Sequence, residues 1–215
     1  MLFSHNAEKG FIPASNQKLF VSACALESWG EPFERVLAKR IKRRRLRKKS
    51  FLFTEINGES NNRLAEIIFR TIGDYQKTSP QSAIRTYLKS KGINPRGLRL
   101  VDGSGRSRKN RATPLLLVNL LNAIYSSKLK NDFLSSLAVS GKRGTLKRRL
   151  LSLTGMVYGK TGYLYSVNCL SGYLFSPRGR FSFSIMINDR KSNFSNWEFM
   201  EGLLSVLGQE GDTQP

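Results

Sequence analysis

The stretch "FIPASNQKLF", residues 11–20, places Ser15 three positions before Lys18 and shortly after Pro13. Apolar residues at helical spacing follow as far as Leu26, which predicts a helix over residues 15–29. Ser15 and Lys18 then share one helix face, near a helix start whose free N–H groups favour a developing negative charge. A serine hydroxyl is a weak nucleophile without a base, and a lysine is that base only when its pKa is lowered.

This pair does not by itself indicate a catalytic site. Ser127 and Lys130 have the same spacing, and an N-cap serine with a surface lysine explains such a pair without any chemistry. A second element is "GKTGYL", which supplies Lys160, Thr161 and Gly162 inside a predicted strand. It is the only Lys-Thr-Gly in the chain, although a strand lysine followed by a glycine bulge would also account for it.

A third element is Ser-x-Asn, which occurs at residues 4–6, 60–62 and 166–168. Only Ser60–Asn62 lies between the other two motifs and opens a predicted helix. Residues 166–168 fall in a predicted turn, where serine and asparagine need no further reason. Ser-x-x-Lys, a Ser-x-Asn type of element and Lys-Thr-Gly form the set that penicillin-binding proteins and serine β-lactamases use.

With these motifs in order, the chain resembles the D-alanyl-D-alanine carboxypeptidases/endopeptidases of the penicillin-binding protein 4 type. Five stretches carry the resemblance, which covers most of residues 1–30 and 55–205: "PASNQKLF", "ESNNRLAEIIFRTIG", "VDGSGRSRKNRATP", "GKTGYL" and "NCLSGYLFSPRGR". Arg106 departs from it, because the family has leucine there. The resemblance implies an α+β fold of the penicillin-binding protein/serine β-lactamase-like transpeptidase class. That fold is an antiparallel sheet with flanking helices, here as one domain over residues 1–215.

The same resemblance implies acyl transfer. Ser15 would attack the carbonyl between two D-alanines, and Lys18 would take its proton. Ser60 would relay the proton to the leaving amine. Asn62 would hold the substrate amide and orient Lys18. Lys160 would help to keep Lys18 neutral by like-charge repulsion.

The third motif would bind the substrate. Lys160 and Thr161 would bind its terminal carboxylate through charge-assisted contacts, and Gly162 would let its backbone lie along the strand. The backbone N–H groups of Ser15 and Tyr163 would form the oxyanion hole. Family members more often have serine or threonine at position 163, so the tyrosine crowds the cleft mouth. Residues 102–105 are interpreted as a structural turn and residues 141–150 as the cleft rim, with solvated charges.

The charge of the chain indicates anionic partners. The formal net charge is +21, and residues 39–49, "KRIKRRRLRKK", carry nine Lys or Arg and no acid. Such a balance favours nucleic acid, acidic lipid headgroups or anionic wall polymers. No aromatic residue lies within 39–50, so stacking on bases is not supported and no specific nucleic acid is expected.

Residues 31–54 are a basic segment where the family usually has a large insertion between its first and second motifs. We expect residues 31–50 to be a surface helix or a linker with little core-forming content. Residues 39–49 should be exposed and pack only through Ile41 and Leu46. Three hypotheses stay open: an active peptidase, a catalytically silent shortened family member, and a polyanion-binding protein that uses residues 39–49.

Other observations limit the class of protein. The single His5 excludes a zinc site with several imidazoles, and no cofactor is expected. Cys24 and Cys169 can form one disulfide or none. No apolar run approaches the roughly 20 residues of a membrane helix, and the N-terminus does not read as a secretion signal. The resemblance nevertheless implies a periplasmic or extracytoplasmic protein with peptidoglycan stem peptides and β-lactams as partners.

The remaining elements follow from periodicity and turn residues. Helices are expected over residues 61–72, ending at Gly73, and over 79–92, 113–127 and 194–207. Strands are expected over residues 98–102, 156–164, 168–175 and 180–189.

Overall fold

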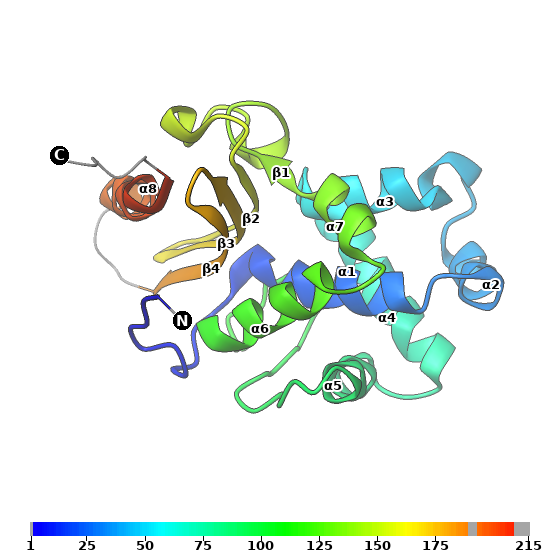
Figure 1. Ribbon diagram of the computed structural model, residues 1–215. Coiled ribbons are helices and arrows are strands. Elements are labelled where there is room, and N and C mark those ends of the chain that lie inside the picture. Colours follow the sequence, from blue (N-terminus) through cyan, green and yellow to red (C-terminus); the bar gives the residue numbers. More distant parts are fainter. Residues whose placement is uncertain (1, 189–192, 209–215) are drawn as a thin grey trace, which may run out of the picture.

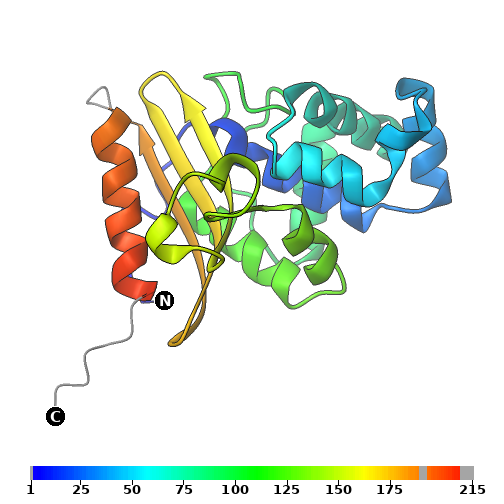
Figure 2. The same ribbon diagram turned by 90° about the horizontal axis from the view of Figure 1, so that it is seen from above.

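The computed structural model describes residues 2–188 and 193–208. Its centre is one antiparallel sheet in the order β1-β2-β3-β4. Helices cover both faces of the sheet, and a larger group of helices extends to one side (Figures 1 and 2). The strands are β1 (Ala138–Val139), β2 (Val157–Leu164), β3 (Val167–Ser176) and β4 (Gly179–Asn188). The three long strands confirm the predicted meander.

The helices confirm most of the predicted ones and add others. Their bounds are η1 (Ala14–Gln17), α1 (Lys18–Glu27), α2 (Glu31–Arg40), η2 (Arg44–Arg47), α3 (Lys49–Asn57), α4 (Asn62–Gln76), α5 (Pro80–Ser90), α6 (Pro114–Tyr125), α7 (Lys130–Ser136), η3 (Gly144–Leu146), η4 (Leu151–Leu153) and α8 (Asn193–Gly208). Ser79 and Thr113 cap α5 and α6 by accepting from the backbone N–H groups of Ser82 and Leu116. Helices α3 and α7 and strand β1 were not predicted.

Strand β3 is buried on both faces, because α8 covers one and α6 with η1 covers the other (Figure 2). Leu170 and Leu174 pack into the core under α8. Cys169 and Tyr173 alternate with them and pack into the core of the helical side. The Tyr173 hydroxyl donates to the Leu121 carbonyl at 2.7 Å, which ties β3 to α6.

The interpretation of residues 31–50 as a surface helix is confirmed for α2, but the expectation that they have little core-forming content is wrong. Phe33 and Leu37 are completely buried and Ile41 is 5% exposed, so one face of α2 belongs to the main core. The three residues recur every four positions, which is the spacing of a buried helix face. Ile41 thus packs as expected, whereas the Leu46 side chain lies outside the described residues.

Two other expectations also change. Residues 98–102 form no strand and contribute only a single bridge, between Arg99 and Arg111. Helix α4 does not end at Gly73 but continues to Gln76, where Lys77 adopts a left-handed conformation.

Cys24 and Cys169 are both buried free thiols, so the disulfide that the sequence left open does not form. Within residues 2–188 and 193–208, none of the helices has the length and apolar character needed to cross a membrane.

Candidate active site

Ser15 lies in η1, the short helix that packs against the sheet just before α1 begins (Figure 1). Asn16 holds η1 on the sheet, since its Nδ2 donates to Ser171 Oγ of β3 at 2.7 Å. Ala14 has a φ of +46°, a strained value for a residue with a side chain. Gly105 approaches the Ala14 carbonyl so closely that a side chain there would collide with it. The turn that presents Ser15 is therefore held from both sides.

Lys18 contacts three of the groups that form the site. Its Nζ lies 2.7 Å from Ser15 Oγ, 2.8 Å from Asn62 Oδ1 and 2.6 Å from the Ser104 carbonyl oxygen. The side chain is fully buried. The structure thus brings together the first and second motifs, which the sequence separates by more than forty positions.

The same burial changes the protonation of Lys18. Desolvation lowers its pKa from 10.5 to about 7, against the opposing attraction of Asp102. Burial, and not the expected repulsion by Lys160, is the main cause of this lowered pKa. A lysine with this pKa is substantially neutral near pH 7, so its free lone pair can accept a proton from the adjacent hydroxyl.

The second motif occupies the loop between α3 and α4. Ser60 has a φ of +64° and lines the same cavity as Ser15. Asn61 caps α4 by accepting from the Leu64 N–H at 3.1 Å, which fixes Asn62 as the first residue of the helix with its side chain toward Lys18. Of the three Ser-x-Asn stretches, only Ser60–Asn62 reaches the site.

The third motif lies in β2, but its lysine faces the interior. Lys160 is fully buried and donates to the Thr161 carbonyl at 2.8 Å. Burial and the nearby Lys18 hold its pKa well below the ordinary value. Thr161 does line the cavity and donates from Oγ1 to Thr145 Oγ1 at 2.8 Å. The position of Lys160 therefore gives no support to the expected contact with a substrate carboxylate.

Glycine is required at position 162 for a structural reason, which differs from the expected role in substrate binding. A Cβ at this position would lie 2.9 Å from the Pro13 carbonyl oxygen and 3.2 Å from Ala14 Cβ. The missing side chain lets β2 and η1 come into contact, so the space beside Gly162 is occupied by the segment that carries Ser15.

These groups surround a cleft of about 440 Å³. Its lining residues are Ser15, Ser60, Asn62, Thr145, Arg149, Thr161, Tyr163 and Trp197. The predicted cleft rim over residues 141–150 is confirmed by Thr145 and Arg149, although their side chains were expected to be solvated and not part of the site. Trp197 was not predicted as a member of the site. Thr145 is fixed to the loop before Ser60 by its N–H, which donates to the Gly58 carbonyl at 3.0 Å. Nothing in the sequence distinguishes Arg149 from the cations beside it, and Trp197 comes from the distant α8.

The turn of residues 102–105 supports the site, in agreement with its interpretation as a structural turn. Asp102 accepts from the N–H groups of Gly105 at 2.6 Å and Ser107 at 2.7 Å. This turn aims the Ser104 carbonyl at Lys18. Nowhere in the described part of the chain do three His, Cys, Asp or Glu residues gather as metal ligands.

The chain is similar in sequence to a known protein family and to several of its characterised members. The model of the D-Ala-D-Ala carboxypeptidase 3 (S13) family matches residues 46–208. A D-alanyl-D-alanine carboxypeptidase of Actinomadura sp. (strain R39) is 35% identical over 143 residues, which are 60% of this chain and 26% of that one. The chain spans between a quarter and about a third of the length of the curated relatives it matches.

Solved structures show the same architecture. Penicillin binding protein 4 from Haemophilus influenzae superposes with a TM-score of 0.68 at 26% identity, over 74% of this chain and 39% of that one. That protein has also been solved with a bound β-lactam. A class A β-lactamase from Bacteroides cellulosilyticus covers 95% of this chain and 85% of its own, with a TM-score of 0.69 at 17% identity. The predicted transpeptidase-like fold is thereby confirmed.

Proposed function

Because the chain belongs to the D-Ala-D-Ala carboxypeptidase 3 (S13) family, we propose that it is a serine-type D-Ala-D-Ala carboxypeptidase/endopeptidase acting on peptidoglycan peptides. The single observation that carries this proposal is the contact of 2.7 Å between Lys18 Nζ and Ser15 Oγ. It joins a hydroxyl to a lysine whose pKa is lowered to about 7 by burial. This combination is what a serine nucleophile needs for activation.

The reaction begins when Ser15 Oγ attacks the carbonyl carbon of the penultimate D-alanine. Its proton passes to neutral Lys18, and the backbone N–H groups of Ser15 and Tyr163 stabilise the oxyanion. The C–N bond then breaks, and Ser60 relays the proton from Lys18 to the leaving amine. An ester of Ser15 remains, and water hydrolyses it with Lys18 again accepting a proton.

Asn62 has a positioning role in this scheme. Its Oδ1 accepts a hydrogen bond from Lys18 at 2.8 Å, which leaves its amide group to donate to the substrate. The two N–H groups of neutral Lys18 donate to Asn62 Oδ1 and to the Ser104 carbonyl, so its lone pair is directed toward Ser15 before substrate arrives. Groups that are fixed in advance stabilise the transition state more strongly in a buried site than they would in water.

β-Lactams are the second class of molecule expected to bind. They present a strained amide at the position of the scissile bond, and a solved relative holds one. The natural substrate class places the protein outside the cytoplasmic membrane, in the periplasm or another extracytoplasmic space.

Release of D-alanine tests the proposal. A peptide ending in D-Ala-D-Ala is incubated with the protein, and free D-alanine is measured. The Ser15→Ala variant should lose more than about a thousandfold of the rate. No release by the folded, unsubstituted protein would favour the catalytically silent alternative.

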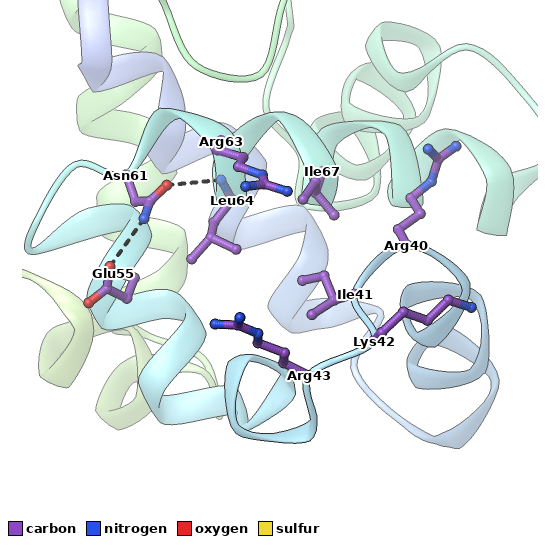
Figure 3. A pocket seen from close by; sticks show the side chains of 9 residues that line it. All are labelled: Arg40, Ile41, Lys42, Arg43, Glu55, Asn61, Arg63, Leu64 and Ile67. Carbon is purple, nitrogen blue, oxygen red and sulfur yellow. Dashed lines mark hydrogen bonds between the residues drawn. The ribbon is translucent and has the colours of Figure 1, made fainter.

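A contact with anionic wall polymers is a second candidate function, favoured by a cationic groove between α4 and residues 40–43. Figure 3 shows this groove, a cavity of about 490 Å³. Its apolar floor is Ile41, Leu64 and Ile67, and its cations are Arg40, Lys42, Arg43 and Arg63. Glu55 is the acid among its lining residues, so the groove attracts polyanions.

The groove and the active-site cleft are both lined by residues of the second motif and the start of α4. Ser60 and Asn62 line the cleft, whereas Asn61 and Arg63 line the groove (Figure 3). A polymer held in the groove is therefore held close to the catalytic serine. In this proposal residues 31–54, which stand in place of the family's insertion, supply one wall of the groove within a single domain of residues 1–215.

A further inference from the structure

We propose that Arg149 is the residue that binds the terminal carboxylate of the substrate, as the cation that the cleft presents to an anionic peptide end. The inference rests on the proposed peptidase function and replaces the role that the sequence assigned to Lys160. The ligand is a peptide C-terminus, or the equivalent carboxylate of a β-lactam.

Arg149 lies where such a carboxylate would arrive. It lines the same cleft as Ser15, Thr161 and Tyr163. Its guanidinium carbon lies 3.9 Å from the ring centroid of Trp197, another lining residue. Stacking on an indole fixes the plane of a guanidinium and leaves the N–H groups at its edge free for a ligand.

Arg149 has an unmatched charge. Among residues 2–188 and 193–208, no carboxylate pairs with it and no acceptor takes a hydrogen bond from its side chain. Burial lowers its pKa from the ordinary value without a counter-ion to offset this. An arginine with free donors at a cleft matches the planar geometry of a carboxylate, which it can bind through two parallel hydrogen bonds.

The other cations near Ser15 are not available for this contact. Lys160 has no exposed surface and donates a hydrogen bond to the Thr161 carbonyl. Lys18 is equally enclosed and is engaged by Ser15, Asn62 and Ser104. Of the described cations near the serine, Arg149 is the one that lines the cleft.

Two threonines complete the site. Thr161 Oγ1 donates to Thr145 Oγ1, and both residues line the cleft beside Arg149. The hydroxyl of Thr145 is left with its own proton to donate outward. A carboxylate at this place would form an ion pair with Arg149 and accept a directional hydrogen bond from this hydroxyl. Recognition of a chain end requires both kinds of contact.

Peptide binding in a Ser15→Ala background tests the inference without chemistry. Two acetylated peptides are titrated by NMR, one ending in D-Ala-D-Ala as the free carboxylate and the other as its C-terminal amide. We expect the carboxylate peptide to bind about tenfold or more tightly than the amide, as charge-assisted hydrogen bonds require. Adding Arg149→Gln should reduce this preference to less than about threefold, and Arg149→Lys should retain part of it.

Arg148→Gln is the matched control, because the neighbouring arginine is exposed and does not line the cleft. It should keep the full preference, and all variants should unfold in one cooperative thermal transition. An equal loss of affinity for both peptides in Arg149→Gln would show a structural role and overturn the inference. A preference that survives Arg149→Gln but disappears in Lys160→Met would also overturn it.

The experiment separates this inference from the proposed function. If the unsubstituted protein released no D-alanine but the Ser15→Ala protein still preferred the carboxylate through Arg149, the peptidase proposal would fail and the binding role would stand. If no carboxylate preference existed in folded protein, the role of Arg149 would fail whatever the activity.

Discussion

Lys18 Nζ lies 2.7 Å from Ser15 Oγ, although the two residues belong to different helices, η1 and α1. The serine belongs to a turn strained at Ala14, and the lysine to a helix whose described residues from Lys18 to Leu26 are all buried. The rigid α1 thus carries the base, and a separate turn aims the nucleophile at it.

The rate of acylation should depend on pH through Lys18. Its pKa is lowered to about 7 in the folded protein, so it is protonated below that pH and cannot accept the Ser15 proton. We expect the second-order acylation rate to rise about tenfold per pH unit below 7 and to level off above it. Stopped-flow measurement between about pH 5 and pH 10 would show this. A rise centred near pH 10, where an ordinary lysine titrates, would contradict the assignment.

Gly105→Ala should disable the site. Gly105 has a φ of +87° and touches the Ala14 carbonyl, so a methyl group there pushes the Ser15 turn away from Lys18. We expect at least about a tenfold loss of acylation rate, since small displacements of reacting groups are costly.

Gly92→Ala is the matched control for this substitution. Gly92 has a similar φ of +71°, but a Cβ there meets no atom within 4 Å. It should cost about 1 kcal/mol of stability through backbone strain alone and leave acylation unchanged. Equal acylation rates in the two variants would show that the contact with Ala14 does not position Ser15.

Ile41→Ala should destabilise the protein by about 2 to 4 kcal/mol, the usual range for emptying a buried isoleucine site. Ile41 is 5% exposed and packs with α4 in the main core. Lys42→Ala, at an exposed neighbouring position, should change stability by less than about 0.5 kcal/mol. Urea unfolding measures both. If Ile41→Ala had as small an effect as Lys42→Ala, the basic segment would not be part of the core.

The cationic groove should bind polyphosphate in a manner that depends on salt. Replacing Arg43 and Arg63 together by glutamine should weaken this binding at low salt, because both guanidiniums line the groove (Figure 3). The difference should fade toward about 0.5 M salt as the charges are screened. The double variant Lys89→Gln/Arg96→Gln removes the same charge from exposed positions outside the groove. Equal weakening in both double variants would show that binding depends on the net charge of the protein and not on the groove.

The sequence predicted the elements whose signals are local. Ser79 and Pro80 marked the start of α5, and alternation between turn residues marked β2, β3 and β4. The predicted motif residues Ser15, Lys18 and Asn62 come together. The spacing within η1 and α1 fixes the first two, whereas the packing of α4 against α1 brings Asn62 to them.

Other features depend on contacts between distant segments. Phe33, Leu37 and Ile41 had helical spacing, but the surrounding charges concealed it. The burial of Lys160 follows from the packing of β2 against η1, and the cleft position of Arg149 goes with its contact with Trp197 of α8. One lysine or arginine in a basic sequence looks like any other until the tertiary structure buries one and exposes the next.

Intact-mass spectrometry after incubation with benzylpenicillin tests the central claim most directly. Covalent acylation requires the nucleophile Ser15, the base Lys18 and the oxyanion hole at the same time. The account predicts one adduct of the mass of the antibiotic, mapped to the peptide that contains Ser15 and absent in Ser15→Ala. No adduct in the folded protein, or an adduct that persists in Ser15→Ala, would contradict it.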